Sequence, residues 1–577
     1  LRDKYLAWIH DLGESQISGK RLIDHLALEE GLSYWWMTLL VEKSVYKSPI
    51  SDAIYLIAIK EIVSEQKPAK LRLVSSSRSL SEALRGLCMN LDIAYEWEKL
   101  SNKRRPELNL RSIFRVLPHP AQALIGLVRH IWCRWPLRKA EKAGWFRSEK
   151  SLFLCSYFFH INNDLAKNGS FHSHYWEGFH DVMRKMGVSG NWLQHYFPHD
   201  AVPSPQRALN LVQRFNQKRL EQGFHTFLDS YLSWRVIFRV LKRWFRLVLI
   251  SRDLSEIKHA FKLQGSNMSL WPLMQQDWYN SMRGRAAIDN LLWIELFNTA
   301  VSDLPHQRVG FYLCENQSWE RALTHAWRKH GHGQLIAVPH STIRFWDLRF
   351  FADPRTINSS NLYPMPQADL TALSGKVAID NCLKAGYPKK AIVECEALRY
   401  LYLDKLRAGS REEKTTEEIK VLILGDYMPS CTVKMLQLLE GALPHMTVPA
   451  TYTIKPHPSY QVNPEDYPSL NLKVVTDHLE KILYNFDVAY SANKTSASVD
   501  SYIAGLQTVV MLDNSELNFS PLRGQPEVLF VRGPEKLAEA LQTARQNTIK
   551  RPESSDFFFL DPELQRWKKL LSPFNPT

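Results

Sequence analysis

KVLIL at residues 420–424, TYTIK at 451–455 and DVAY at 487–490 are short apolar, partly β-branched runs. The same third of the chain holds three more runs of this kind, Leu472–Val475, Thr508–Leu512 and Val528–Val531. Amphipathic segments lie between them, among them Val433–Leu443, Ala497–Ala504 and Pro534–Arg545. This alternation predicts βαβ units and a doubly wound parallel sheet, whose ligand binds beyond the carboxyl ends of the strands.

The charged, apolar-poor stretch Ser410–Thr416 (SREEKTT) is typical of an interdomain linker. We therefore expect a C-terminal Rossmann-like domain at 417–550 and an N-terminal α/β domain at 1–409. The strands expected in the N-terminal domain are Tyr5–Ile9, Leu71–Ser75, Leu152–Phe158 and Val309–Leu313. Residues 551–577, apolar and helical in pattern over Phe557–Leu571, are expected to pack back across the N-terminal domain.

Composition agrees with a folded chain of more than one domain. The chain has 577 residues, of which 45% are hydrophobic and 23% charged, too long for one core and average for globular proteins. Its net charge of +14 implies an anionic partner. The 7 cysteines form no CxxC pair, so neither a disulfide framework nor a zinc site is indicated. No signal-peptide pattern opens the sequence, which favours a cytoplasmic location.

Two basic, aromatic segments interrupt the N-terminal half, in insertions at about 112–150 and 224–252. Ala121–Trp135 is followed by Arg and Lys residues, and Tyr231–Ile250 interleaves Trp and Phe with Arg and Lys. Each is too short or too charged to cross a bilayer, which takes about 20 mainly apolar residues. We expect interfacial helices that contact an anionic membrane surface, and no nucleic-acid binding. The alternative is a pair of core helices with solvated basic residues.

A histidine lies between two prolines where the run 451–455 ends, in the sequence Lys455-Pro456-His457-Pro458. The prolines fix the backbone around the imidazole, and Lys455 adds a second cationic group at the ligand edge of the sheet. This pattern suits a phosphate. A His-Pro pair on its own is more often structural.

Hydroxyl side chains follow the run 487–490, at the expected start of the next helix. They are Thr495, Ser496 and Ser498. Hydroxyls and unpaired backbone N–H groups at a helix N-terminus form an anion site, although one hydroxyl would suffice for simple N-capping. Gly425, directly after residues 420–424, completes the predicted nucleotide-binding set.

The KPHP loop and the TSAS element resemble the His-Pro and Ser-Ser/Thr motifs of bacterial sialyltransferases, polysialyltransferases and capsule Kdo transferases. Those families have a GT-B fold and use CMP-activated ulosonic acids. The resemblance implies that His457 stabilises the departing CMP phosphate while Ser496 and Ser498 grip it. Here the serine pair is split by Ala497.

A wider resemblance covers most of the chain. DWYNSMRG (277–284), ENQSWE (315–320), GHGQLIAVPHSTIRFWD (331–347) and GYP (386–388) look like a bacterial family of surface carbohydrate biosynthesis proteins from spirochaete O-antigen loci. That family implies lipopolysaccharide or capsule assembly. It does not itself identify the donor or the acceptor; the partners that we expect are a CMP-activated acidic sugar and a glycan or glycolipid acceptor. The sheet pattern alone fits a UDP- or GDP-sugar enzyme equally well, and a non-catalytic scaffold of the assembly machinery is a further alternative.

Glu315 directly follows the expected strand 309–313, at the mouth of the N-terminal sheet. A glycosyltransferase needs a carboxylate there, as a base for the acceptor hydroxyl or as a nucleophile. The alternative is that Glu315 caps the next helix. Asp11 and Glu14, in the polar turn expected after Tyr5–Ile9, are the second choice for this carboxylate.

A second histidine motif, in the sequence VPHSTIR, follows the apolar run 334–338. His340 could contact the acceptor or the donor carboxylate, with Arg344 as an ion-pair partner for the latter, and Ser341 joins the predicted substrate-binding residues. The alternative is that His340 is a structural histidine. Asn316 and Gln317, next to Glu315, join the predicted substrate-binding residues. No DxD pair or Walker motif is evident, so we expect no metal and no cofactor beyond the CMP-sugar donor.

Overall fold

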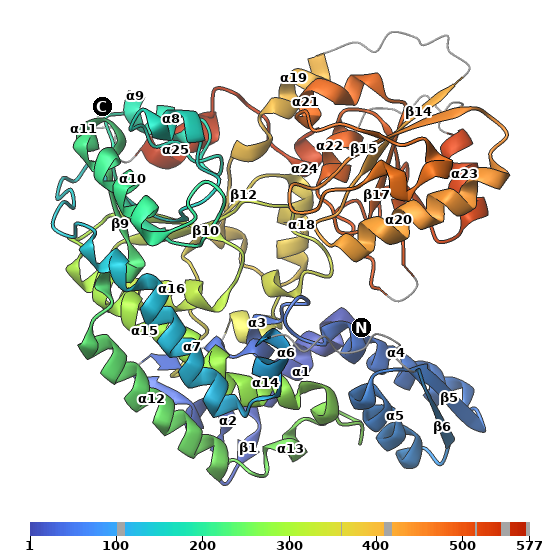
Figure 1. The fold of residues 1–577 in the computed structure, drawn as a ribbon. Helices are drawn as coiled ribbons and strands as arrows, with labels where there is room; N and C mark the ends of the chain where they lie inside the picture. Colours follow the sequence, from blue (N-terminus) through green and yellow to red (C-terminus); the bar gives the residue numbers. More distant parts are fainter. Residues whose placement is uncertain are drawn as a thin grey trace.

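The computed structural model describes residues 1–29, 31–100, 110–358, 361–408, 418–513, 516–543 and 554–572. Two parallel sheets dominate it, one in each half of the chain, and Figure 1 shows the halves side by side. The expected linker 410–416 lies outside the described residues. The prediction of two Rossmann-like α/β domains is confirmed by these sheets.

The C-terminal sheet contains all six predicted strands. They are β14 (Ile419–Leu424), β15 (Ala450–Lys455), β16 (Lys473–Val474), β17 (Val488–Ala492), β18 (Gln507–Met511) and β19 (Leu529–Val531). Their order, β16-β15-β14-β17-β18-β19, is that of a Rossmann sheet, with the reversal of strand order between β14 and β17. Hydrophobic clusters cover both faces, with α20 (Pro429–Ala442) and α23 (Pro534–Thr543) on one and α22 (Ala497–Ile503) on the other.

The N-terminal sheet has the same topology extended by one strand. Its strands are β7 (Ser151–Tyr157), β8 (Ser189–His195), β9 (Phe224–Phe227), β10 (Val309–Cys314), β11 (Gln334–Pro339), β12 (Leu370–Leu373) and β13 (Ile392–Glu394). The order is β13-β12-β11-β10-β7-β8-β9, so the reversal lies between β7 and β10. The sheet therefore begins at residue 151, far later than the sequence analysis expected.

Tyr5–Ile9 is not a strand. It lies inside helix α1 (Arg2–Glu14), whose buried side chains Tyr5, Trp8, Ile9 and Leu12 recur at helical spacing. The five residues of the predicted strand are too few to show this helical period, which is visible only over the whole helix. Consequently Asp11 and Glu14 lie in the last turn of a helix, and the prediction that a turn after a strand carries them is wrong.

Leu71–Ser75 does form a strand, but not in the large sheet. It belongs to β5 (Lys70–Ser75), which, among the residues that the structure describes, pairs only with β6 (Ala94–Lys99), in parallel. Helices α4 (Ile50–Gln66) and α5 (Arg78–Asn90) accompany this small unit, which Figure 1 shows apart from both large sheets. Its strands alternate between half-buried and exposed side chains, whereas β7 is buried throughout.

The two basic segments are helices, as predicted. They are α7 (His119–Arg134) and α12 (Trp234–Asp253), which lie on the outside of the N-terminal domain in Figure 1. Both pack on α15 (Arg285–Asp303). Within the described residues, no helix is long and apolar enough to cross a membrane.

The chain's last helix lies against the N-terminal domain. Helix α25 (Gln565–Leu571) places Trp567, fully buried, against Phe179 and Phe311 at ring-centroid distances of 4.8 and 5.9 Å. A short helix, α24 (Ser554–Phe557), precedes it. The tail therefore crosses back from the C-terminal domain (Figure 1).

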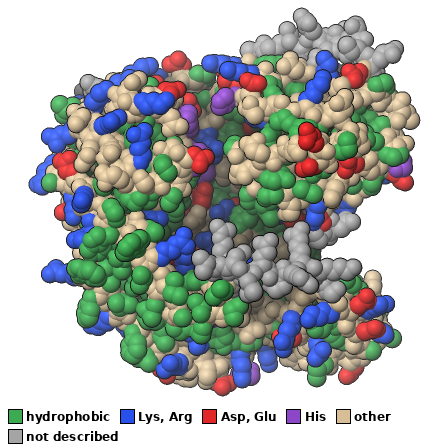
Figure 2. Space-filling view, in the orientation of Figure 1, with side chains coloured by type: hydrophobic (Ala, Val, Ile, Leu, Met, Phe, Trp, Pro, Cys, Tyr) green, Lys and Arg blue, Asp and Glu red, His purple; other side chains and the backbone are tan. Residues whose placement is uncertain are grey.

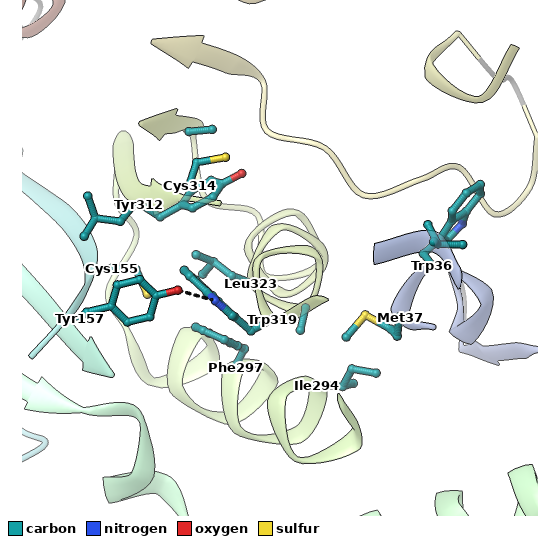
Figure 3. Packing of buried hydrophobic residues seen from close by; sticks show 14 of the residues in the cluster. Trp36, Met37, Cys155, Tyr157, Ile294, Phe297, Tyr312, Cys314, Trp319 and Leu323 are labelled. Carbon is teal, nitrogen blue, oxygen red and sulfur yellow. Dashed lines mark hydrogen bonds between the residues drawn. The ribbon is translucent and has the colours of Figure 1, made fainter. Parts of the chain in front are cut away.

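The core of the N-terminal domain fixes the loop after β10. Helix α16 (Ser318–Lys329) buries Trp319, whose indole N–H donates to the Tyr157 hydroxyl over 3.1 Å at the end of β7. Figure 3 shows Trp319 between Tyr157, Leu323 and Phe297. The start of α16, and with it the chain around Glu315, is thereby held at the carboxyl edge of the sheet.

Candidate functional site

The carboxyl ends of β14 and β15 come together at His457. A Cβ on Gly425 would lie 3.0 Å from the His457 amide nitrogen and 3.1 Å from the Pro456 Cα, so glycine allows the two loops to touch. The Ser459 N–H donates to His457 Nδ1 over 3.2 Å, and the Ser459 hydroxyl lies 2.7 Å from the same nitrogen. Nδ1 is therefore the acceptor, which places the proton on Nε2. Nε2 has no hydrogen-bond partner in the described part of the chain.

The predicted hydroxyls lie at the start of α22, as expected. Ser498 donates to the Thr495 carbonyl over 2.9 Å, a bond within the first turn. Ser496 instead accepts a 3.0 Å hydrogen bond from Arg344 Nη2, across the cleft from the N-terminal domain. Ser496 is therefore a cleft residue, whereas Ser498, which is buried, supports the turn.

Lys455 points along the sheet edge. Its Nζ donates to the Thr476 carbonyl over 3.1 Å, at the end of β16. Burial lowers the pKa of its ammonium, and Asp477 partly offsets this. Lys455 thus lies on the ligand edge of the sheet, as predicted, but it is engaged by the chain itself.

Two charged residues that the sequence analysis missed stand at the reversal of strand order. Asp426 follows β14 and is fully buried, with Oδ2 lacking any hydrogen-bond partner in the described structure. Burial raises its pKa, while Lys494, Arg344 and His457 lower it. Lys494, which follows β17, pairs with Glu516 over 2.8 Å. The rule that ligands bind at such a reversal could have singled out both residues.

Glu315 does not cap helix α16. Gln317 is the N-cap, and Glu320 completes a capping box while accepting the N–H groups of Glu315, Asn316 and Gln317 at 2.8 to 3.0 Å. Asn316 has a left-handed backbone with φ of 55°. Because Glu320 satisfies these donors, the Glu315 carboxylate is left for other partners, and the capping alternative is excluded.

The partners of Glu315 are a histidine and an amide. His340 Nε2 donates to Oε1 over 2.8 Å, and the Gln317 side-chain amide donates to Oε2. Burial by itself raises the pKa of Glu315, but His340, Arg349 and Gln317 lower it to about 2. The carboxylate is therefore ionised at neutral pH, and the two motifs ENQ and VPH meet at the mouth of the sheet.

His340 is fixed on both sides. Arg399 Nη1 lies 3.1 Å from Nδ1, and because a guanidinium can only donate, Nδ1 is the acceptor. Tyr175 packs against the imidazole with centroids 4.7 Å apart and the rings tilted by 58°. Burial lowers the pKa of His340, and Glu315 opposes that shift. Arg399 and Tyr175 carry no sequence signal that would have singled them out.

The rest of the VPHSTIR loop reaches the cleft. Ser341 is half-buried on it, and Phe345 lies between two arginines, Arg2 at 4.3 Å and Arg523 of the C-terminal domain at 4.0 Å. With the Arg344 contact described above, this loop joins the two domains.

A second line of contacts connects the two halves. Arg349 Nη1 lies 3.9 Å from Glu315 Oε2 and its guanidinium lies 5.9 Å from the Tyr46 ring. Tyr46 meets Tyr427 edge-on at 6.0 Å, and Tyr427 lies 6.3 Å from His457. Figure 2 shows the hollow between the domains, with basic and histidine side chains in it.

Asp11 and Glu14 lie elsewhere. Asp11 pairs with Arg355 over 2.9 Å, and Glu14 binds Arg21 and the Asn361 amide, each over 3.0 Å. These contacts fasten α1 to neighbouring loops, and no described contact joins either carboxylate to His340 or to the C-terminal domain. The structure therefore favours Glu315 as the cleft carboxylate.

Two Rossmann-like domains that face one cleft define the GT-B class of fold. No protein-family model matches the chain, and no curated protein does. Among solved structures, the chain is similar to the calicheamicin glycosyltransferase CalG4, with 8% identity, 74% of this chain and 94% of that chain covered, and a TM-score of 0.35. It is also similar to MurG of Acinetobacter baumannii, with 11% identity, 74% and 99% covered, and a TM-score of 0.35. Anabaena HepE, solved with UDP and glucose, shows 11% identity, 74% and 95% covered, and a TM-score of 0.32. At these scores the likenesses carry no argument, and the fold class rests on the two sheets themselves.

Proposed function

We propose that this chain is a glycosyltransferase that moves a Kdo or nonulosonic sugar from its CMP ester to a surface-glycan acceptor, an O-antigen or capsule glycan. The observation that carries the proposal is the pairing of two sets of groups across one cleft. One set, His457 with Ser496, suits a phosphate, and the other, Glu315 with His340, suits an acceptor hydroxyl. Arg344, four residues after His340 on the same loop, donates a hydrogen bond to Ser496 of the first set.

On the donor side, His457 Nε2–H is aligned to donate to a phosphate oxygen, since Ser459 occupies Nδ1. Arg344 and Ser496 would hold a second oxygen of the phosphate or the donor carboxylate. Negative charge grows on the phosphate as the glycosidic bond breaks, and preorganised donors stabilise it most at that stage. Since these groups and Lys494 meet that charge, we propose that transfer needs neither a metal ion nor a cofactor.

On the acceptor side, Glu315 would take the proton of the attacking hydroxyl. A carboxylate whose pKa is about 2 is a weak base, and His340 is the first partner that lowers it. When the acceptor hydroxyl replaces His340 as donor to Oε1, that lowering is lost and the carboxylate becomes a stronger base. The acceptor oxygen then bonds to the anomeric carbon, the carbon–phosphate oxygen bond breaks, and CMP leaves. A retaining enzyme would instead use Glu315 as the nucleophile.

The acceptor is brought to the enzyme, we propose, at a membrane surface, the cytoplasmic face of the inner membrane. Helices α7 and α12 expose large apolar side chains to solvent, including Trp132 at 84% and Trp234 at 67%. The other exposed apolar residues of this face are Leu124, Ile125, Val128, Phe238, Phe245 and Leu249. Core helices would bury these side chains, so the core-helix alternative does not account for them, whereas an interfacial helix needs them.

Basic side chains surround this apolar face, which is the large hydrophobic area over α7 and α12 in Figure 2. Arg129, Arg235, Lys242 and Arg246 are exposed there, while Arg239 and Arg243 turn inward and pair with the buried Glu295 at 2.8 and 2.9 Å. The inward arginines fasten α12 to α15, and the outward ones would meet anionic headgroups.

A nucleotide panel tests the donor. In a thermal-shift experiment a ligand that binds only the folded state stabilises it by RT ln(1 + c/Kd), where c is the ligand concentration, so at equal concentration the tighter ligand raises the melting temperature more. CMP should stabilise the protein more than UMP or GMP at equal concentration. Equal stabilisation by all three would favour a UDP- or GDP-sugar enzyme, and no stabilisation by any would favour the non-catalytic scaffold.

A further inference from the structure

A cavity of about 290 Å³ lies inside the N-terminal domain, next to the candidate carboxylate. Asn316, Gln317 and Arg349, the immediate neighbours of Glu315, line one part of it. Arg328 lines another part and also borders an outer pocket beside Lys329 and His325. The cavity therefore extends from the surface towards the acceptor side of the cleft. Its volume approaches the lower limit for small-molecule sites, about 300 Å³.

Two cations in the cavity wall have no carboxylate partner. Lys43 is 2% exposed and Arg321 is 7% exposed, and neither makes a salt bridge within the described residues. Lys43 donates to the Val41 carbonyl over 2.8 Å, and Arg321 donates to the carbonyls of Trp36 and Val41. An ammonium has three N–H donors and a guanidinium five, so most of their donors remain unused. Two neighbouring buried cations that make no salt bridge are costly to the fold.

The acidic residues of the same wall are already engaged. Glu320 accepts three backbone N–H groups at the start of α16, and burial raises its pKa to about 7. Asp369 pairs with Arg328 over 3.3 Å. Burial and the nearby Arg321 lower the pKa of Lys43, and Glu42 opposes that shift. Glu42, buried beside both cations, also opposes the lowering of the pKa of Arg321 but pairs with Lys47 over 2.5 Å. The cavity wall therefore keeps two buried cations that make no salt bridge within the described residues.

The backbone of Lys43 supports a role for its side chain. Lys43 closes the short helix α3 (Leu39–Glu42) with φ of 53°, in the left-handed region where glycine fits best. A lysine there costs backbone strain, and residues held in this way gather at ligand sites. Lys67 closes helix α4 in the same conformation, with φ of 45°, but its side chain is exposed. The two lysines differ in their surroundings: Lys43 is buried and lines the cavity, whereas Lys67 is exposed to solvent.

We propose that this cavity binds the anionic group of an acidic or phosphorylated sugar in the acceptor, with Lys43 and Arg321 as its counterions. The assignment of this sugar to the acceptor rests on the proposed glycosyl transfer. The binding of an anionic sugar in the cavity does not. Carboxylate and phosphate share the chemistry that these cations recognise, and Arg321 can bind either with two parallel hydrogen bonds. A neutral sugar would leave both cations without a counterion.

Calorimetry on the full chain tests this, with glucuronate, glucose 6-phosphate, glucose and inorganic phosphate as probes. At least one of the two anionic sugars should bind at least tenfold more tightly than glucose, and whichever binds better indicates whether the natural group is a carboxylate or a phosphate. Lys43→Met should lose at least tenfold in that affinity, and Lys67→Met should lose none. Equal binding of glucose, or equal loss in both variants, would overturn the proposal. Inorganic phosphate that binds as well as glucose 6-phosphate would overturn the carbohydrate part.

Two further measurements keep the result decisive. If Lys43→Met does not fold, amide exchange of the native protein should show that the anionic sugar protects residues 39–43 and 316–328, and protection elsewhere only would contradict the site. CMP should not displace the sugar. If CMP competes with the sugar, the sugar binds in the C-terminal domain. That result would contradict this inference but not the proposed function. If the anionic sugar binds but no nucleotide does, the proposed function is contradicted and this inference stands.

Discussion

Arg344 Nη2 donates to Ser496 Oγ over 3.0 Å, across the cleft between the two Rossmann-like domains. The two residues are 152 positions apart, and each follows a strand end, Arg344 after β11 and Ser496 after β17. Because this arginine also lowers the pKa of Asp426, as His457 does, one N-terminal cation faces the phosphate side of the cleft. Donor binding and domain closure should therefore depend on the same side chain.

Arg344→Met should weaken CMP binding by about 10- to 100-fold, since a hydrogen bond to a charged group contributes about 1.5 to 3 kcal/mol. Calorimetric titration with CMP measures the loss. Arg308→Met, an exposed arginine at the amino end of β10, is the matched control and should bind CMP normally. Unchanged affinity in Arg344→Met would show that Ser496 and Arg344 meet only in the empty cleft.

His457→Ala should reduce both CMP affinity and transfer, because Nε2–H would contact the phosphate in the ground state and more strongly as the bond breaks. His478→Ala removes an exposed histidine of the same domain and should change neither. The comparison of kcat with the CMP dissociation constant separates the two effects. Full activity in His457→Ala would return the KPHP loop to a purely structural role.

Parallel strands were the most predictable part of this chain, since a strand buried on both faces is a continuous apolar run. Strands β14, β17 and β18 could be placed for that reason, and so could β7 and β10. Strands β15, β16 and β19 are partly or fully exposed and were placed from their short β-branched runs and their spacing. The prediction of a strand at Tyr5–Ile9 was wrong because a short apolar run is equally typical of a buried helix. Glu315 and His340 could each be picked out after a strand, but their 2.8 Å contact depends on the pairing of β10 with β11.

The contacts across the cleft could not be predicted from the sequence, for a related reason. Arg344 with Ser496, and Tyr46 with Tyr427, join segments whose separation depends on how the two domains are docked. No local period or spacing encodes that arrangement. Lys43 and Arg321 are a further case, because only the structure shows that both are buried beside a cavity and that neither makes a salt bridge within the described residues.

Membrane binding should depend on the exposed aromatic residues of α7 and α12. The double change Trp132→Ser and Trp234→Ser should abolish flotation with liposomes that contain anionic lipid, since it removes two large apolar anchors. Leu220→Ser, which removes an apolar side chain that is 86% exposed on another helix, is the control and should float normally. Binding of the unchanged protein should fall at 1 M salt, where the Debye length shrinks to about 3 Å. Binding that resists salt would indicate deep insertion.

Asp229 should anchor α7 to the N-terminal domain. Its buried carboxylate pairs with Arg134 over 2.7 Å and with His130 over 3.2 Å, both on α7. Asp229→Asn should destabilise the domain by about 3 to 5 kcal/mol, because it breaks a buried ion pair. Urea unfolding measures this, and Asp164→Asn, an exposed surface carboxylate, should cost under about 0.5 kcal/mol.

The ion pairs of Asp229 with Arg134 and His130 also predict that the stability of the domain depends on pH. Burial by itself raises the pKa of Asp229, but Arg134 and His130 lower it well below its usual value. A carboxylate with a lowered pKa in the folded state stabilises the protein fully above its unfolded pKa of about 4, and this is lost as the pH falls further. The gap in unfolding free energy between the native protein and Asp229→Asn should therefore be constant from pH 7 to 5 and shrink below about pH 4. A gap that grows on acidification would contradict the assignment.

Glu315 is the most informative residue to change, because the structure gives it one charge, two donors and a place at the cleft. Glu315→Gln keeps the shape and can still hydrogen-bond, but it cannot take a proton. CMP affinity should survive, since no described contact joins Glu315 to the C-terminal domain. Transfer should fall by about 10²-fold or more, the loss typical of a missing general base.

Asp11→Asn and Glu14→Gln are the matched controls, as carboxylates of the same domain that bind Arg355 and Arg21 within structural contacts. They should keep CMP affinity and most of the transfer rate, with at most a lower melting temperature. His340→Ala adds a test of how Glu315 is held: it removes the donor to Oε1, so the pKa of Glu315 should rise and the acid limb of the rate profile should move to higher pH. A fully active Glu315→Gln beside an inactive Asp11→Asn or Glu14→Gln would transfer the catalytic role to helix α1.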